Sequence, residues 1–445
     1  QILIENDSNY LREHNSVMQT LRWLWRSKGR LLRFKYSEAI PPKYHEESHL
    51  LATFLVSYSQ AYPNDVEILF DMLRVLMQPS TFDFTFVKDH MQRRVSTDMS
   101  VDQMKNILSR FFVILNGDEA EDVKILVLQL LVLPLLQSLL VPRQHSSCDD
   151  IGSISDDIGH PALEGSVKAL AMAAASDDGA ANPSNKEIKG DSAVPPVARQ
   201  VIDDHILTRF LNEAILQAGI RRRYGSRLTA EILKMSSLLL EFFWHDLEDS
   251  RKDLIKCSWN LIKLDDINTK NWAYQATCRF ISVYEAPPRI IHQVYIALLR
   301  SYQPEAKDLV RLSLDLLIPA LLRRLEAEDF RRAIKYTNKV MYEEGHHSVP
   351  QLTHIFQTIV RHPEVFYYHR HLFVPQMINS LSRIGLPASS PQEHRNLSII
   401  LVELVLDWEE GIAGKGSSNE TGAILKAVFG QDRNKSVKAA GAADR

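Results

Sequence analysis

Two apolar stripes run through the stretch LVRLSLDLLIPAL, residues 309–321. At helical spacing one stripe holds Leu309, Leu312, Leu316 and Ala320, and the other holds Val310, Leu314, Leu317 and Leu321. A helix with one apolar stripe packs on a single core, whereas two stripes require cover on two sides. The stretch therefore predicts a helix stacked between neighbours, as in an array of helical repeats.

Helical periodicity continues along most of the chain. Similar stripes occur at Leu51–Tyr58, Val66–Met77 and Leu228–Phe242. No convincing run of strict apolar–polar alternation appears, so no sheet is expected. About sixteen helices of ten to twenty residues are predicted. The fold class expected is all-α, an α-solenoid of HEAT-like helix pairs with repeats near 40 residues, and a compact helical bundle is the alternative.

Start and stop signals separate these helices. The sequence Ser-Pro-Gln-Glu at 390–393 has the pattern of a capping box with proline at the first helical position, and serines 100, 250 and 348 begin similar patterns. Gly385, which is followed by Pro387, predicts a helix stop in the left-handed conformation.

Composition excludes several classes of protein. Apolar residues make up 45% of the 445 residues and charged residues 24%, which excludes a wholly disordered chain. Lys and Arg total 52 against 55 Asp and Glu, so bulk charge does not favour nucleic-acid binding. The three cysteines, 148, 257 and 278, are far apart, which fits free thiols in a reducing compartment. No signal peptide is recognised.

The apolar stretch Ile125–Val141 raises the question of a membrane span. It is interrupted by Gln129, Pro134, Gln137 and Ser138 and falls short of the ~20 residues that a span needs. A buried helix of a large helical protein is the favoured interpretation, and no membrane association is expected.

Four segments are expected along the chain. Residues 143–199 contain no Phe, Tyr or Trp, and they hold nine acidic and five basic residues. Such a composition predicts a disordered acidic insert. HEAT-like repeats are expected at 1–142 and 200–410. Residues 411–445 are expected to form a flexible tail with a short apolar island at Ala423–Phe429.

The sequence contains only weak matches to catalytic and metal-binding motifs. His45-Glu46-Glu47-Ser48-His49 matches H-E-x-x-H, the zinc-binding pattern of one class of peptidases. Pro41 and Pro42 place it in the first turn of a helix, and no third ligand follows at the usual spacing, so a solvated helix start is favoured. The glycines of 411–416 lack the Walker spacing. No catalytic, cofactor-binding or metal site is therefore expected, and the chain is not expected to be an enzyme.

The densest basic cluster is Arg221-Arg222-Arg223, followed by Tyr224 and Arg227. An acidic partner could use such a cluster. A solvated turn between helices, beside the acidic insert, is the simpler interpretation. These three arginines are the candidate partner-binding residues.

Several blocks, in order along the chain, resemble the TRRAP (transformation/transcription domain-associated protein) family. They cover most of the chain outside the acidic insert, and several contain tryptophan. The blocks are Leu21–Arg30, Ile40–His45, Ile68–Phe86, Glu343–Leu352, Val402–Glu409 and Ala423–Gly430.

This resemblance implies a central segment of a giant HEAT-repeat relative of the phosphoinositide-3-kinase-like kinases whose kinase domain, outside this segment, is inactive. It implies a nuclear scaffold of histone acetyltransferase coactivator complexes, of the SAGA and NuA4/TIP60 types, that receives transcription activators on chromatin. The expected partners are coactivator-complex subunits and activators within a large hetero-complex, with no direct contact to nucleic acid.

Three alternatives stay open from the sequence. One is the helical region of an active kinase of the same superfamily, which kinase motifs further along the chain would reveal. Another is a zinc peptidase at His45–His49, which stoichiometric zinc would support. A HEAT-repeat nuclear-transport receptor is the third, and binding to Ran would identify it.

Overall fold

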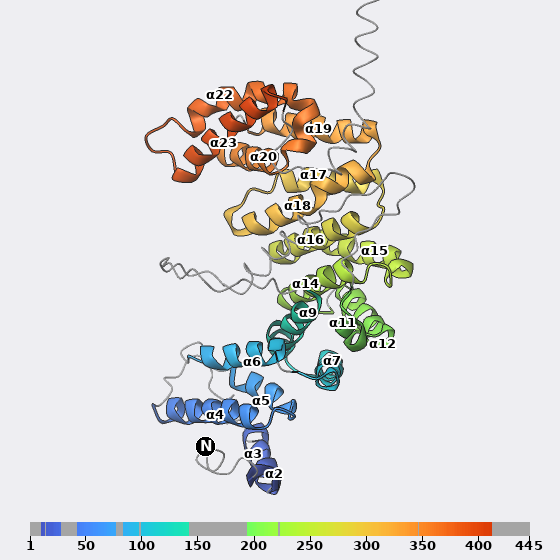
Figure 1. Ribbon diagram of the computed structural model, residues 1–445, viewed down its shortest axis with the longest axis vertical. Helices are drawn as coiled ribbons and strands as arrows, with labels where there is room; N and C mark the ends of the chain where they lie inside the picture. The colour runs from blue at the N-terminus through green and yellow to red at the C-terminus, as the bar shows by residue number, and fades with distance from the viewer. Residues whose placement is uncertain are drawn as a thin grey trace, which may run out of the picture. The chain divides into compact units, whose positions relative to one another are not determined.

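The computed structural model describes residues 10–13, 15–27, 42–76, 83–97, 99–141, 194–220, 223–345 and 347–411 (Figure 1). These residues are almost entirely helical and contain no strand. Sixteen helical runs within them are ten or more residues long, if the two runs that contain a π segment are each counted once. The predicted all-α fold is confirmed.

The described residues fall into two compact units, one that ends at Asp246 and one that begins at Leu247. The described elements of the first unit are α2 (Tyr10–Glu13), α3 (Asn15–Ser27), α4 (Pro42–Ala61), α5 (Glu67–Leu76), α6 (Thr85–Thr97), α7 (Val101–Asn116), α8 (Glu121–Val127), π-helix η1 (Leu128–Val132), α9 (Leu133–Leu140), α11 (Pro196–Val201), α12 (Asp204–Arg209), π-helix η2 (Phe210–Ile215), α13 (Leu216–Ala218) and α14 (Ser226–Phe242). The expected acidic insert lies outside the described residues except at its end, where α11 begins at Pro196 and buries Ala198.

The centre of the first unit is the continuous run α8–η1–α9, which α5, α6, α7, α11 and α14 contact. It covers Glu121–Leu140 and is long and apolar enough to span a membrane by length and composition alone. Its apolar side chains, among them Leu131 and Leu135, are buried against these neighbours, as expected for a core helix. The interrupting Gln129 donates a hydrogen bond of 2.8 Å to buried Glu231 on α14, which also pairs with Lys234.

A π turn accommodates the proline in this central helix. Pro134 has no N–H, so the carbonyl of Leu130 loses its usual helical partner. The preceding turn widens, and the N–H of Leu133 donates to the carbonyl of Leu128, five residues earlier. The helix runs continuously through Pro134 by way of this widened turn.

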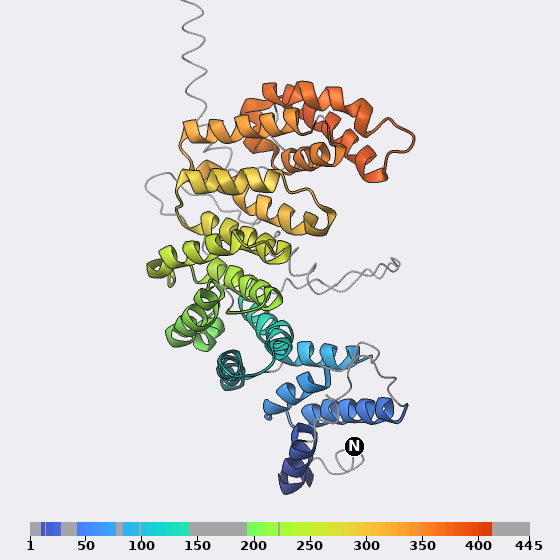
Figure 2. The same ribbon diagram turned by 180° about the vertical axis from the view of Figure 1, so that it is seen from behind.

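The second unit stacks helix upon helix, as Figures 1 and 2 show from opposite sides. Its described elements are 3₁₀ turn η3 (Glu248–Ser250), α15 (Arg251–Ile262), α16 (Ile267–Val283), α17 (Pro288–Leu299), 3₁₀ turn η4 (Pro304–Ala306), α18 (Lys307–Arg324), α19 (Ala327–Glu343), α20 (Val349–Arg361), α21 (Pro363–Phe366), 3₁₀ turn η5 (Tyr367–Leu372), α22 (Val374–Ile384) and α23 (Gln392–Glu409). Each helix packs mainly on elements near it in sequence, which is the contact pattern of a repeat array.

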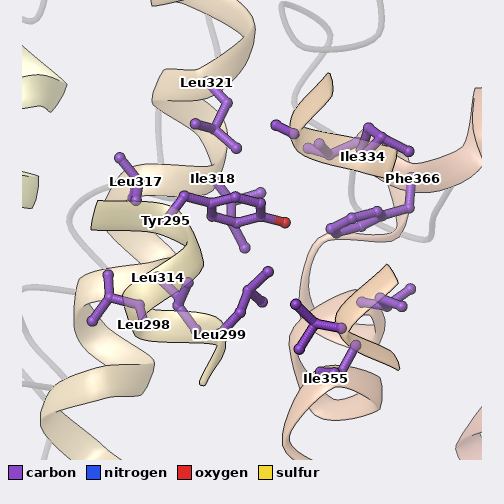
Figure 3. Packing of buried hydrophobic residues seen from close by; sticks show 14 of the residues in the cluster. Tyr295, Leu298, Leu299, Leu314, Leu317, Ile318, Leu321, Ile334, Ile355 and Phe366 are labelled. Carbon is purple, nitrogen blue, oxygen red and sulfur yellow. The ribbon is translucent and has the colours of Figure 1, made fainter. Parts of the chain in front are cut away.

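Helix α18 is covered on two sides, as its two stripes predict. It packs on α16, on α17 and on the α20–α21 region. Leu314, Leu317 and Leu321 of one stripe are buried, and Leu309, Leu312 and Leu316 of the other are half-buried. Figure 3 shows Leu314, Leu317 and Ile318 facing Tyr295 of α17, with Ile334, Ile355 and Phe366 on the other side of the core. The Tyr295 hydroxyl lies 2.7 Å from the hydroxyl of Thr337, so its polar end is satisfied inside this core.

Two of the predicted caps are confirmed and two are wrong. Ser100 and Gln103 form a complete capping box, and the Ser348 side chain accepts from the N–H of Gln351. Ser250 makes no side-chain cap: it is the last residue of turn η3, and its ψ of 5° differs from the extended conformation of a capping residue. Helix α23 starts one residue later than predicted, so Pro391 occupies the N-cap and Ser390 lies outside the helix.

Gly385 ends α22, but it does not adopt the predicted left-handed conformation. Its φ is −101°, which an alanine could adopt. The reason for glycine is close approach: a Cβ at this position would lie 2.5 Å from Oγ and 2.7 Å from Cβ of Ser398 on α23. Among the described glycines, the left-handed conformation occurs at Gly411, just after α23, with φ of 84°.

We predict that Gly385→Ala lowers the free energy of unfolding by about 1–3 kcal/mol, because α22 and α23 must separate to admit the methyl group. Urea denaturation measures this cost. In a Ser398→Gly background the opposing side chain is gone, and Gly385→Ala is expected to cost almost nothing. An equal cost in both backgrounds would contradict the close-approach explanation.

A charged triad joins α18 to α20. Asp315 accepts a hydrogen bond of 2.8 Å from Arg361 Nε, and Nε2 of His362 lies 2.9 Å from the same carboxylate oxygen. Burial acts to raise the pKa of Asp315, but the hydrogen bond from His362 and the charge of Arg361 outweigh it and hold that pKa below its ordinary value. A depressed carboxyl pKa stabilises the fold above the unfolded pKa, and this stability is lost as the pH falls through the folded pKa.

Asp315→Asn is therefore expected to lower the free energy of unfolding by about 1–3 kcal/mol at pH 7. As the pH falls from about 4, the unfolded pKa, through the lower folded pKa, the difference from the unsubstituted chain should shrink progressively, because the folded carboxyl is protonated only in that range. Urea denaturation at a series of pH values from about 7 down to about 2.5 checks this. Asp308→Asn on the same helix is the control, since Asp308 is exposed. A difference that stays constant with pH would refute the role assigned to the Asp315 charge.

Candidate partner-binding surfaces

The predicted basic cluster lies in the turn between α13 and α14. Arg221 and Arg222 lie outside the described residues, and Arg223 is described and exposed. The Arg223 guanidinium carbon lies 5.8 Å from the centre of the Tyr224 ring. The Tyr224 hydroxyl donates a hydrogen bond of 3.1 Å to the carbonyl of Glu213, and burial raises the pKa of this phenol. Tyr224 therefore anchors the turn, and the exposed Arg223 lies over its ring.

Acidic side chains from another part of the sequence lie beside this cluster. Arg223 lines a shallow pocket together with the turn between α7 and α8; the other lining residues are Leu115, Asn116, Gly117, Asp118, Glu119, Glu121, Lys124, Tyr224 and Leu228. Arg227 pairs with Asp122 at 3.3 Å. Arg223 and Arg227 are thus part of a mixed-charge surface, whose acidic residues lie about a hundred residues earlier and could not be paired with them from sequence spacing.

The base of this surface is held by a hydrogen-bonded carboxylate. Glu213 accepts a bond of 2.7 Å from Arg209 and one of 2.6 Å from Asn116 of α7. These contacts, the Arg209 bond foremost, hold the pKa of Glu213 below its ordinary value. The Arg209 guanidinium also stacks over the ring of Phe112, 4.2 Å from its centre. Together these contacts tie η2 to α7 and give the surface a rigid support.

The H-E-x-x-H match lies in the first turns of α4, as its preceding prolines predict. The side chains of His45, Glu46 and Glu47 lie outside the described residues. Nδ1 of exposed His49 lies 3.5 Å from the hydroxyl of Thr53, and its ring lies 5.5 Å from that of Phe86. Among the side chains that the structure describes, no group of three His, Cys, Asp or Glu is placed to hold a metal ion.

A second surface, which the sequence did not indicate, is an apolar groove between α22 and α23. We call it the terminal groove. Its walls are Met377, Ile378 and Leu381 of α22 and Leu401, Val402, Val405 and Leu406 of α23. The apolar residues of α23 form a second stripe outside the face that packs on α20 and α22. This second stripe was the sequence signal from which the groove could have been predicted.

The stacked helix pairs, the confirmed double cover of α18 and the absence of strands from the described ranges define an α-solenoid of the HEAT class. The chain matches the family described as the Tra1 HEAT repeat ring region over residues 1–444, and it belongs to that family.

The relatives agree with this assignment and confirm the TRRAP-family resemblance. The chain is 29% identical over 406 residues to "Probable transcription-associated protein 1" of Dictyostelium discoideum, which covers 90% of this chain and 8% of that protein. It is 25% identical to the human "Transformation/transcription domain-associated protein" over 92% of this chain and 10% of the relative. It is 33% identical to the "SAGA complex/NuA4 acetyltransferase complex subunit TRA1" of Saccharomyces cerevisiae over 51% of this chain and 5% of the relative. The chain thus spans about a tenth or less of these relatives.

Substitution of the exposed Arg227 and of the hydrogen-bonded Tyr224 should change the stability of the fold to different extents. Arg227→Ala is expected to change the free energy of unfolding by less than about 0.5 kcal/mol, because its pair with Asp122 is exposed on both sides. Tyr224→Phe should cost about 1 kcal/mol, because the carbonyl of Glu213 loses its donor. Urea denaturation distinguishes the two, and equal costs would contradict the anchoring role of Tyr224.

Proposed function

We propose that this chain is a non-enzymatic HEAT-repeat scaffold segment of a transcription coactivator subunit. It belongs to histone acetyltransferase complexes of the SAGA and NuA4 types, acts in the nucleus and helps to recruit the complexes to activators on chromatin. The observation that carries the proposal is the family match across residues 1–444, together with relatives named as subunits of these complexes.

The titratable groups with strongly shifted pKa values support a structural role. The pKa of the Cys278 thiol is raised by complete burial, which leaves it inert as a nucleophile. The pKa of Tyr295 is also raised by burial, and its hydroxyl is held by Thr337 within the core of the second unit. Burial lowers the pKa of His369 to about 4, so this imidazole is neutral at physiological pH. Each of these shifts arises from packing.

Partner binding would rest on shape and on several weak contacts. Stacked helices present grooves in which an amphipathic activator segment can place apolar side chains. Arg221, Arg222 and Arg223 would supply positive charge at the rim for an acidic segment. The carboxylates of Asp118 and Glu119 beside Arg223 oppose this attraction, so most of it must come from Arg221 and Arg222.

The proposal is tested by affinity capture from nuclear extract with this chain as bait and identification of the bound proteins by mass spectrometry. Acetyltransferase-complex subunits or activators are expected. Recovery of nuclear-transport factors in their place, or of nothing above a bait-free control, would contradict it.

The arginine contribution is tested separately. Reversal of Arg221, Arg222 and Arg223 to Glu should weaken binding of an acidic activation-domain peptide several-fold, and less so at high salt, where screening already removes the attraction. The matched control reverses three exposed lysines of the second unit, Lys252, Lys256 and Lys263. Unchanged affinity in the arginine variant, or an equal loss in the control, would rule out these arginines as contacts.

A further inference from the structure

The terminal groove leaves large apolar side chains in contact with water. Ile378 is 53% exposed, Val402 43% and Leu406 58%, although all three line one continuous groove. Scattered single apolar residues on a surface need no explanation, but a contiguous apolar groove indicates a surface that is normally covered. The groove belongs to the last helix pair that the structure describes in the second unit.

The packing of this pair explains why the groove is open. Helices α22 and α23 both pack on α20, and buried residues such as Ile384 and Trp408 join the core of the second unit. The exposed residues of α23 lie on the opposite face, where an array would place its next element. Helix α18 shows what a covered helix of the same unit looks like, with neighbours on both sides.

The sequence after α23 contains an apolar segment that matches the apolar walls of the terminal groove. Residues 412–422 are polar and glycine-rich, and Ala423–Phe429 then reads Ala-Ile-Leu-Lys-Ala-Val-Phe. At helical spacing Ile424, Leu425, Val428 and Phe429 share one face. This segment carries an apolar stripe one to two turns long, which is the size of occupant that a groove between two short helices accepts.

The connection is long enough to reach any part of the groove. Eleven residues separate Gly411 from Ala423 and span at most about 40 Å when extended. Helix α23 has 18 residues and is therefore about 27 Å long. The tether also keeps the segment at an effective concentration near the millimolar range, so even weak apolar contacts suffice.

Charge favours the same pairing. Glu403, Glu409 and Glu410 are exposed on α23 or at its end. Residues 412–445 hold six basic and three acidic residues, and Lys426 lies within the apolar segment itself. A segment that carries a positive charge is thus tethered to a helix whose C-terminal end carries exposed carboxylates.

We propose that Ala423–Phe429 docks into the terminal groove, places Ile424 and Val428 against Val402 and Leu406, and covers the exposed apolar side chains of the groove. The docked segment supplies an apolar neighbour on the face of α22 and α23 that the described elements leave uncovered. This contact lies within the chain and stands whether or not the chain binds coactivator subunits, so its test is independent of the capture experiment.

Hydrogen exchange of the 445-residue chain tests the docking. Ile424→Asp combined with Val428→Asp should accelerate amide exchange in α22 and α23 about tenfold, because the apolar contacts of the docked segment are lost. Val437→Asp combined with Ala440→Asp adds the same charge to the same tail outside the segment and should leave exchange unchanged. All four positions lie beyond α23, so these substitutions do not alter the described core.

Disulfide trapping gives a second readout with a defined geometry. In a Cys148→Ser background, Leu406→Cys with Val428→Cys should oxidise to an intrachain disulfide about tenfold faster than Leu406→Cys with Val437→Cys. The remaining cysteines, Cys257 and Cys278, are buried and do not compete.

Equal exchange in the two aspartate variants together with equal oxidation rates would overturn the proposal. Disulfides that form between two chains, with rates that rise with protein concentration, would also overturn it and would assign the groove to self-association.

Discussion

The structure depends on one constraint: many of its helices are apolar on more than one side and cannot be stable without neighbours on each. Helix α18 satisfies this with α16 and α17 on its flanks and the α20–α21 region beyond, and the run α8–η1–α9 satisfies it within the first unit. Because such helices require cover on two sides, the sequence favours serial stacking over a single closed core. The terminal groove follows from the same rule, as the place where the described stack ends with apolar side chains uncovered.

Several polar side chains in these packed layers have a specific partner on another helix. Gln129 reaches Glu231, and Asp315 holds Arg361 and His362. A buried polar group without a partner would cost about 1–3 kcal/mol, so such pairs restrict how one helix can slide along another. Apolar stripes alone would allow two helices to pack in several registers. The charged triad between α18 and α20 allows few, because its three side chains must meet.

The fold was largely predictable from sequence, because helical periodicity and the double stripes of residues 309–321 are local signals. Caps at Ser100 and Ser348 were also readable. The conformation of Gly385 was not, because its need for glycine comes from Ser398, which lies on the next helix. Likewise the acidic neighbours of Arg223 come from the α7–α8 turn, and only the folded chain brings these charges together. The terminal groove was missed because a second apolar stripe on α23 does not reveal which face lacks a neighbour.

The central claim, that stability is shared between stacked neighbours, is tested most directly by hydrogen exchange of a Leu314→Ala variant. Leu314 is fully buried in α18, and its truncation should cost about 2–5 kcal/mol. The account predicts faster exchange in α18 and in its neighbours α16, α17 and α20, with helices of the first unit such as α4 unchanged. Faster exchange in α18 alone, or to the same extent in every helix of the chain, would contradict it.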